Sequence, residues 1–203
     1  MTSLLISIKH RCPRIWQAVE LVNGWLFAWR CPGFGHAAAE VMAEYDCGEF
    51  GFAPVVAEDI PALSEFLNRQ PAESREHFDP HGFDAETLTR LLRNPAFVMM
   101  KAVCRDGGSL VGYFFLRCFF IGRAFHGLIV DRSYTNCGLG TSMWAVSSQI
   151  CYRCGLRMFA TVSRHNAASL ASARRGTQVT VTEELAGGYL LVECKPKNDE
   201  KTL

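Results

Sequence analysis

Apolar residues recur along this chain with two spacings, every second position in some segments and every third or fourth position in others. The first spacing is typical of β-strands and the second of helices that pack one face on a core. Strands are therefore predicted at residues 52–57, 97–104, 110–118, 125–130, 159–162, 177–182 and 189–194. Helices are predicted after Asp59, after Asp84, at 138–154 and at 166–175. This order predicts an α/β fold with a mixed central sheet flanked by helices.

Cap and turn residues mark several boundaries of these elements. Asp59 can cap the first helix, and Pro61 then lies in its first turn. Asp84 can cap the second helix, which must end before Pro95 because the residue before a proline avoids the helical conformation. Residues 105–109, Arg-Asp-Gly-Gly-Ser, are typical of a hairpin turn and join two of the predicted strands.

The amino-terminal part of the chain has a different pattern. A helix is predicted at residues 15–30, between Pro13 and the run Cys31-Pro32-Gly33. It holds three of the four tryptophans, and its apolar residues cover more than one stripe. Such a helix packs on the main domain, pairs with a second copy of the chain or contacts a membrane surface, in that order of expectation.

We therefore expect three parts in the chain. Residues 1–45 form a helical extension, residues 46–195 form the main domain, and residues 196–203 form a charged tail. Two hundred residues are enough for one such domain to bury a core of its own.

Composition excludes several classes of protein. The chain has 21 basic and 20 acidic residues and no basic stripe with interleaved aromatics, so we expect no nucleic-acid partner. No stretch approaches the roughly 20 apolar residues that span a bilayer, so no transmembrane segment is expected. The first eight residues are apolar, but the charged residues follow them, which is the reverse of a signal peptide. A cytoplasmic location is the expectation.

The nine cysteines are scattered, odd in number and mostly within apolar runs. This pattern favours reduced thiols in the core over a disulfide framework. Cys151 and Cys154 have the spacing of half a metal site, but no second half follows at a suitable distance. We expect no bound metal.

The most informative segment runs from Leu128 to Thr141, where a strand ends, a polar turn follows and Gly138 and Gly140 open a helix. The first turn of a helix leaves backbone N–H groups unpaired and carries partial positive charge. Glycines allow a phosphate to approach that backbone closely. The segment therefore predicts a site for a pyrophosphate group.

This segment resembles the acyl-CoA loop of the GNAT superfamily of N-acetyltransferases, whose pattern is Arg or Gln, two residues, Gly, any residue, Gly or Ala. Gly138 and Gly140 match the pattern, and Thr135 stands where Arg or Gln is usual. The run 162–166, Val-Ser-Arg-His-Asn, is similar to the strand end and asparagine that open the family's next helix. The resemblance extends over roughly residues 50 to 195.

The resemblance implies a GNAT-like fold and acetyl-CoA as co-substrate. It also implies which residues contact that co-substrate, from the core strand, the loop and the asparagine: Leu128, Ile129, Val130, Thr135, Asn136, Cys137, Gly138, Leu139, Gly140, Thr141 and Asn166. Family members often carry a tyrosine seven residues after the asparagine, as the acid for the departing thiolate. Here that position is Ala173, with Ser172 beside it.

His126 is the candidate base. In the arylalkylamine branch of the family a histidine at this place helps to remove a proton from the substrate amine. An attacking amine must be neutral, and a histidine of ordinary pKa, about 6.5, accepts a proton near pH 7. The alternative is a core histidine bonded to a backbone carbonyl.

Three further residues are candidates for binding the acceptor. His77 and His81 belong to a loop between the two early helices, where the family forms one wall of the acceptor site. Arg117 ends a strand and could hold a carboxylate or phosphate of the acceptor. The structural alternative for the two histidines is a simple turn, and the alternative for Arg117 is a solvent-exposed strand end.

We expect an enzyme that transfers an acetyl group from acetyl-CoA directly to the amine of a small polar acceptor, such as an amino sugar. The alternative is a degenerate GNAT domain that binds acyl-CoA without turnover, as a sensor or scaffold. The absent tyrosine and Thr135 favour that alternative.

Overall fold

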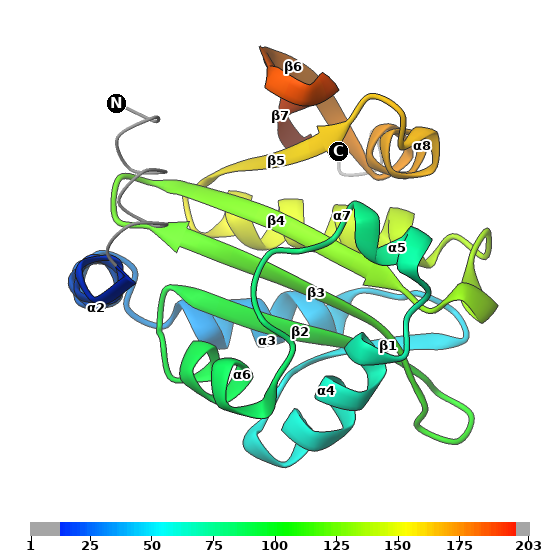
Figure 1. Cartoon of the computed structure of the whole chain (residues 1–203), viewed down its shortest axis with the longest axis horizontal. Coiled ribbons are helices and arrows are strands. Elements are labelled where there is room, and N and C mark those ends of the chain that lie inside the picture. Colours follow the sequence, from blue (N-terminus) through cyan, green and yellow to red (C-terminus); the bar gives the residue numbers. More distant parts are fainter. Residues whose placement is uncertain (1–12, 198–203) are drawn as a thin grey trace.

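The computed structural model of the chain describes residues 13–197. Its centre is a seven-stranded sheet in the order β1-β2-β3-β4-β5-β7-β6, with helices on both faces (Figure 1). The strands are β1 (Phe50–Pro54), β2 (Phe97–Cys104), β3 (Leu110–Phe119), β4 (Arg123–Val130), β5 (Arg157–Ser163), β6 (Thr177–Leu185) and β7 (Tyr189–Pro196). The mixed α/β architecture predicted from the sequence is confirmed.

Seven α-helices and three short 3-10 turns connect the strands within the described residues. The helices are α2 (Pro13–Arg30), α3 (Phe34–Glu44), α4 (Ile60–Asn68), α5 (Ala72–Glu76), α6 (Ala85–Leu92), α7 (Leu139–Arg153) and α8 (Ala167–Gly176). The turns are η1 (Ala57–Asp59), η2 (Arg132–Tyr134) and η3 (Ala186–Gly188). In the described part of the chain no helix is long and apolar enough to cross a membrane.

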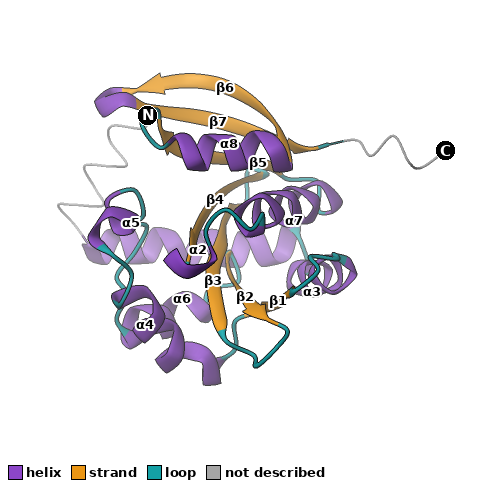
Figure 2. Cartoon of the chain, turned by 90° about the vertical axis from the view of Figure 1, so that its right-hand side faces the viewer, coloured by secondary structure: helices purple, strands orange, loops and turns teal. Residues whose placement is uncertain are grey.

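Alternation along the strands divides the core into two clusters, one on each face of the sheet. On β2, Phe97 and Met99 join the cluster under α4 and α6, whereas Met100 and Ala102 join the cluster under α3 and α7. Figure 2 shows the corresponding helices on the two sides of the sheet. Because successive side chains of a strand point to opposite faces, this sheet has to be covered on both.

The helix predicted after Asp84 begins as expected, and the one predicted after Asp59 begins differently. The Asp84 carboxylate accepts a hydrogen bond from the Thr87 N–H at 2.8 Å, which confirms the N-cap. Asp59 makes no such bond to α4, so its predicted role as a helix cap is wrong. Its carboxylate instead pairs with Lys101 Nζ at 2.6 Å and accepts the Val56 N–H at 2.9 Å. The preceding turn η1 leads directly into α4, which leaves the carboxylate free for the cation on β2.

Helix α3 was not predicted, and it packs on the main core. Phe34, Val41 and Met42 are at most 5% exposed and belong to the same cluster as the residues under α7. The side chain of Phe27 from α2 is fully buried in this cluster too. The core is therefore continuous across residue 46, where the sequence predicted the main domain to begin.

Candidate active site

A cleft opens where β4 and β5 separate. These neighbours form the sheet's single parallel pair, and their register runs only from Arg123 opposite Arg157 to Phe125 opposite Phe159. Beyond these pairs, β4 continues to Val130 and β5 to Ser163 without pairing to each other. Backbone groups on the facing edges of the two strands are thus available to a ligand.

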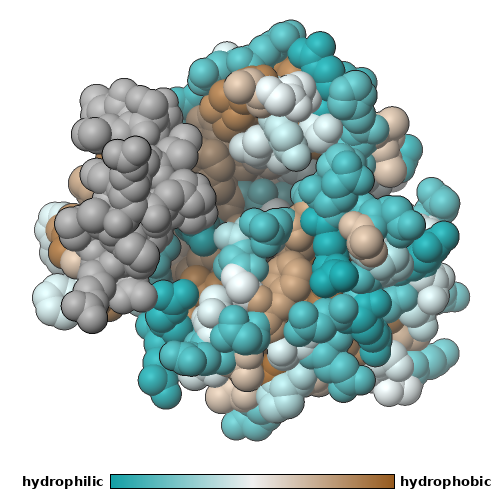
Figure 3. Space-filling model, viewed as in Figure 1, coloured by the Kyte–Doolittle hydropathy of each residue, from teal (hydrophilic) through white to brown (hydrophobic). Residues whose placement is uncertain are grey.

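The cleft belongs to a cavity of about 760 Å³ between β4, β5, α5, α7 and α8. Figure 3 shows the surface hollowed on this face, below the region of α8 and β6. The volume lies in the range of about 300–1,000 Å³ found for pockets that take small molecules and cofactors.

The amino-terminus of α7 lies at this cavity. Gly138 precedes the helix with a φ of 88°, and Asn136 also has a positive φ, 64°. The Ser142 N–H makes the first helical bond, to the Gly138 carbonyl, at 3.1 Å. The N–H groups of residues 139–141 precede that bond, so they lack an acceptor within the helix. A Cβ on Gly138 would have no neighbour within 4 Å, so the left-handed φ, and not crowding within the chain, explains a glycine here.

The turn before α7 is held in place by Asp131. Its carboxylate accepts the Ser133 N–H at 2.9 Å and contacts Arg69 Nη2 at 3.3 Å and Gln70 Nε2 at 3.4 Å. These hydrogen bonds lower the pKa of Asp131 more than partial burial raises it. The chain between β4 and α7 is therefore fixed to the end of α4, which fixes the direction of the α7 amino-terminus.

Most of the predicted co-substrate residues line this cavity. They are Leu128, Ile129, Val130, Thr135, Asn136, Gly138, Gly140, Thr141 and Asn166. Cys137 and Leu139 do not line it: the Cys137 thiol donates to the Tyr134 carbonyl at 2.8 Å, and Leu139 is buried in the core. The side chain of Asn166 caps α8, because its Oδ1 accepts the Ser169 N–H at 2.9 Å, and this bond does not use the NH2 group.

The candidates for acceptor binding lie in three different places. His77, at the end of α5, is exposed and lines the cavity. His81 lies outside the cavity lining, against Phe83, Phe97 and Phe115. Arg117 also lies outside it, with its guanidinium over the Phe97 ring at 5.2 Å. Only His77 of the three is brought to the cleft.

His81 is bonded within the fold. Its Nδ1 lies 2.8 Å from the Gly82 carbonyl, which can only accept, so Nδ1 carries the proton and Nε2 accepts from the Tyr113 hydroxyl at 3.1 Å. The pKa of His81 is lowered, mainly because burial disfavours the charged ring. This half-buried histidine is held by hydrogen bonds within the fold.

His126 lines the cavity but is itself deeply buried. Its side chain is 6% exposed, its ring lies 4.4 Å from the Trp144 ring, and neither ring nitrogen has a hydrogen-bond partner among the described residues. Burial lowers its pKa from 6.5 to about 3, and the nearby Phe115 backbone offsets only part of that effect. The ordinary pKa expected from the sequence does not apply, and the ring is neutral throughout the physiological range.

This burial predicts how stability depends on pH. Below pH 6.5 the unfolded chain binds a proton on His126, and the folded chain does not until about pH 3, so the free energy of unfolding falls as the pH falls through this range. From pH 6.5 to 5 this one group should cost about 2 kcal/mol. Urea unfolding at the two pH values should show this extra loss in wild type and its absence in His126→Gln. Parallel pH dependences in the two proteins would contradict the buried, neutral state.

Three of the lining residues that the sequence did not point to carry polar or charged groups of interest. Arg175 of α8 reaches back to α7, where its Nε lies 3.5 Å from Thr141 Oγ1, and it is the one arginine or lysine among the described residues of the cavity lining. Trp144 forms part of the floor, and its indole N–H has no partner among the described residues. Glu73 of α5 lines the wall beside His77. No local motif marks them, because the cavity joins helices far apart in the sequence.

Comparison with known proteins supports the resemblance. The model of the acetyltransferase (GNAT) family matches residues 60–176, more than half of the chain. The chain belongs to the GNAT acetyltransferase family. A comparison with curated proteins finds no match.

Solved structures of GNAT proteins share the fold at low sequence identity. The GNAT domain of PAT from S. lividans has a TM-score of 0.62 at 16% identity, covering 72% of this chain and 90% of that one. The PaiA N-acetyltransferase of Thermoplasma acidophilum, solved with coenzyme A, has a TM-score of 0.59 at 18% identity, covering 74% and 100%. The aminoglycoside acetyltransferase AAC(6')-Ib, solved with coenzyme A and kanamycin, has a TM-score of 0.58 at 14% identity, covering 73% and 95%.

One position of this GNAT chain departs from the family where a catalytic acid is common. Ala173 is fully buried between α8 and the core, so it presents nothing to the cavity. Ser172 does line the cavity, and its hydroxyl donates to the Ser169 carbonyl at 2.9 Å. Gly176 ends α8 so close to α7 that a Cβ would collide with the Thr141 carbonyl. The two helices that border the cleft are thus packed directly on each other.

Among the described residues, no three His, Cys, Asp or Glu side chains are grouped closely enough to hold a metal ion. Cys151 is buried and Cys154 half-buried, and burial raises the pKa of both thiols. Both cysteines at the end of α7 therefore carry neutral thiols near pH 7.

Proposed function

We propose that this protein transfers an acetyl group from acetyl-CoA directly to the amine of a small polar acceptor. The observation that carries the proposal is the separation of β4 and β5 beside the amino-terminus of α7. A cleft with free strand edges and a positive helix end suits a long ligand with an amide-containing arm and a diphosphate.

Acetyl-CoA is the co-substrate of the family, and GNAT neighbours were solved with coenzyme A bound. The residues at the cleft fit it. The N–H groups of residues 139–141 would hold the diphosphate, and the Asn166 NH2 group would meet the arm. Arg175, beside Thr141, would supply the side-chain cation that Thr135 cannot.

The proposed reaction needs no acyl-enzyme. The amine nitrogen forms a bond to the acetyl carbonyl carbon, the carbon–sulfur bond breaks, the nitrogen loses a proton and the departing thiolate gains one. Alignment of amine and thioester in the cavity would supply much of the rate.

We propose that the acceptor is a cationic polar amine and that it enters past α5. Glu73 and His77 line this wall and are exposed. The Glu73 carboxylate lies 3.9 Å from Arg132 Nη1 in an exposed, loose pair, and it can still attract an ammonium group. AAC(6')-Ib, a neighbour in fold, was solved with an aminoglycoside, which has amines of this kind. His81 bonds to Tyr113 and Arg117 packs on Phe97, both outside the cavity lining. A role for them at the acceptor remains a prediction.

His126 remains the proposed catalytic residue, but as a hydrogen-bond acceptor for the amine and not as a base that deprotonates an ammonium group. With a pKa of about 3 its ring accepts hydrogen bonds but competes poorly for a proton with an ammonium group. We expect it to orient an amine that arrives neutral, so turnover should rise with pH as the acceptor ammonium group loses its proton and should show no inflection at pH 6.5. His77, which lines the same cavity but is exposed, is the histidine to substitute for comparison in the pH profile.

The second candidate function is binding of acyl-CoA without turnover. The buried Ala173 and the unpartnered nitrogens of His126 favour it, since Ala173 offers no proton donor and no described residue activates the histidine as a base. A cytoplasmic location and a homodimer remain predictions under either function.

The choice between acetyl transfer and binding without turnover can be tested by measuring the release of CoA thiol from acetyl-CoA in the presence of polyamines, amino sugars and aminoglycosides. Transfer predicts acetyl-CoA-dependent thiol release with at least one amine and an acetylated product of the expected mass. His126→Ala should lower kcat by roughly 10²-fold, with less effect on the KM for acetyl-CoA. Tight acetyl-CoA binding with no thiol release for any amine would instead assign the protein to the binding class.

A further inference from the structure

Helix α2 presents its apolar residues to solvent. Six large side chains of α2 are 40% to 84% exposed. They are Val19, Leu21, Val22, Trp25, Leu26 and Trp29, here called the outer stripe. At about 3.6 residues per turn they occupy one side of the helix, within an arc of roughly 160°. This stripe points away from the fold.

The opposite side of α2 attaches the helix to the domain. Phe27 is fully buried, and a Cβ on Gly24 would lie 2.8 Å from Asn94 Oδ1, which shows how closely the helix backbone packs there. Asn23 fixes the β3–β4 turn: its Nδ2 donates to the Cys118 carbonyl at 2.9 Å, and its Oδ1 accepts the Phe120 N–H at 3.2 Å. The helix is therefore held firmly with its apolar stripe outward.

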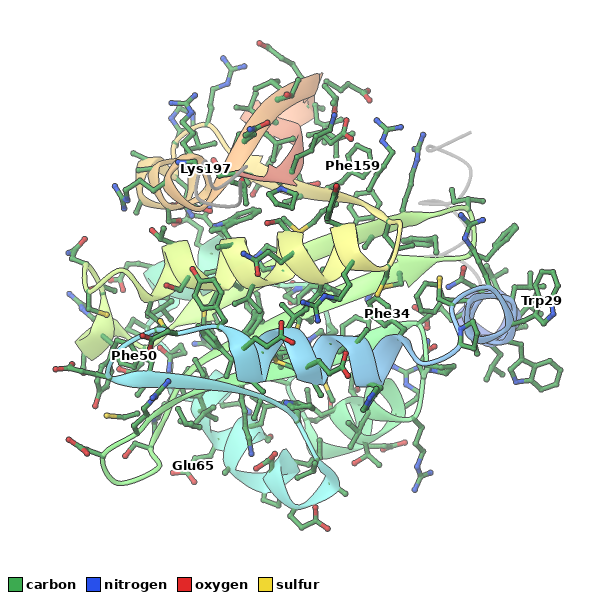
Figure 4. The ribbon with its side chains drawn as sticks, turned by 180° about the vertical axis from the view of Figure 1, so that it is seen from behind. Trp29, Phe34, Phe50, Glu65, Phe159 and Lys197 are labelled. Carbon is green, nitrogen blue, oxygen red and sulfur yellow. The ribbon has the colours of Figure 1, made fainter. Side chains whose placement is uncertain are left out.

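The patch extends beyond the helix. Phe120 and Ile121 in the β3–β4 turn are 45% and 59% exposed, next to the Asn23 anchor. Figures 1 and 4 show α2 end-on at the edge of the molecule, and in Figure 4 Trp29 projects away from the fold. Trp25 and Trp29 are 77% and 84% exposed. Since a tryptophan side chain has a surface of about 150–250 Å², the two expose an apolar area close to that of the largest apolar patch on a typical monomer, about 300–600 Å².

Charge around the stripe is positive. Glu20 is the one acidic residue between 18 and 30, and it lies toward the fold, where its charge offsets part of the lowering of the Arg117 pKa by burial. Arg30, next to Gly122, and Arg123 are exposed beside the patch. The described side chains at the rim of the patch are therefore basic, although the whole chain carries a net charge of only +1.

We propose that the outer stripe docks on an anionic lipid membrane surface. Tryptophan prefers the membrane–water interface, where its ring is apolar and its N–H is wet, and basic residues at the rim attract anionic headgroups. A second copy of the chain fits the charges less well. Two copies paired stripe to stripe would bring two basic rims to one interface, with Arg30 of each copy at its edge.

Vesicle sedimentation of the full chain tests the proposal, using phosphatidylcholine with and without phosphatidylglycerol. We expect sedimentation with the anionic vesicles, weaker binding at high salt, and quenching of tryptophan fluorescence by brominated lipid. Trp25→Ser and Trp29→Ser should each weaken binding about tenfold or more, and Arg30→Gln about fivefold on anionic vesicles. Tyr152→Ser is the matched control, because Tyr152 is 76% exposed on α7 and outside the patch.

Two results would overturn the proposal. One is sedimentation that is absent, or equally strong in Trp25→Ser and Trp29→Ser. The other is a concentration-dependent dimer that these substitutions dissociate, without vesicle binding, which would assign the stripe to a second copy. Circular dichroism of each variant confirms that the fold is retained, and neither result bears on acetyl transfer.

Discussion

Gly140→Asp is expected to abolish acetyl-CoA binding while leaving the protein as stable as the wild type. Gly140 occupies the second position of α7, where an acidic side chain interacts favourably with the helix dipole by about 0.3–1 kcal/mol. A Cβ there would lie 3.7 Å from Ser172 Cβ and 3.9 Å from Val130 Cγ2, both ordinary contacts with residues that line the cavity. The new carboxylate would then face the bound diphosphate, and repulsion should weaken binding by about 100-fold or more.

Gly140→Asn is the matched control, because it adds a side chain of the same shape without the charge. Its dissociation constant for acetyl-CoA should stay within about tenfold of wild type. Calorimetric titration measures both constants, and thermal melting without ligand measures stability. Equal affinity in wild type and Gly140→Asp, with unchanged melting, would show that the diphosphate binds elsewhere.

Removing residues 1–45 is expected to leave no folded domain. The deletion takes away Phe27, Phe34, Val41 and Met42, which are at most 5% exposed in the main core. Loss of one large core side chain costs about 2–5 kcal/mol, and a whole domain is stable by only about 5–15 kcal/mol. Circular dichroism and thermal melting of the shortened chain should therefore show no cooperative transition.

Two point variants separate core from surface in the same region. Phe34→Ala should lower the free energy of unfolding by about 3–5 kcal/mol, whereas Trp29→Ala, at an 84% exposed position, should change it by about 0.5 kcal/mol or less. If the chain from residue 46 onward melted cooperatively and bound acetyl-CoA, the domain boundary predicted from the sequence would stand.

The sheet and its helices could be predicted because each element carries its own local pattern. Strand β2 was predicted with its observed bounds, and Asn166 was placed correctly at the start of α8. Helix α3 was missed because the residue before it, Gly33, has a left-handed backbone and provides no side-chain cap that could mark a helix start in the sequence. Its burial depends on α7 and β1, which are distant in the chain.

The co-substrate loop was predictable, and the environment of the candidate base was not. The loop is one contiguous segment whose glycines and helix start are visible in the sequence. The depressed pKa of His126 arises from Trp144 and other residues that enclose it from other elements. For the same reason the sequence could not show that His77 lines the cavity whereas His81, four positions on, is a half-buried partner of Tyr113.

Hydrogen exchange with and without acetyl-CoA tests most directly the claim that the co-substrate lies between β4 and β5 against the first turn of α7. The amides of residues 139–141 lack an acceptor within the helix, so they exchange fast in the free protein. Acetyl-CoA should slow exchange there and along residues 126–130 of β4, and should leave α2 unchanged. Protection confined to other segments, with saturating acetyl-CoA bound, would contradict this placement.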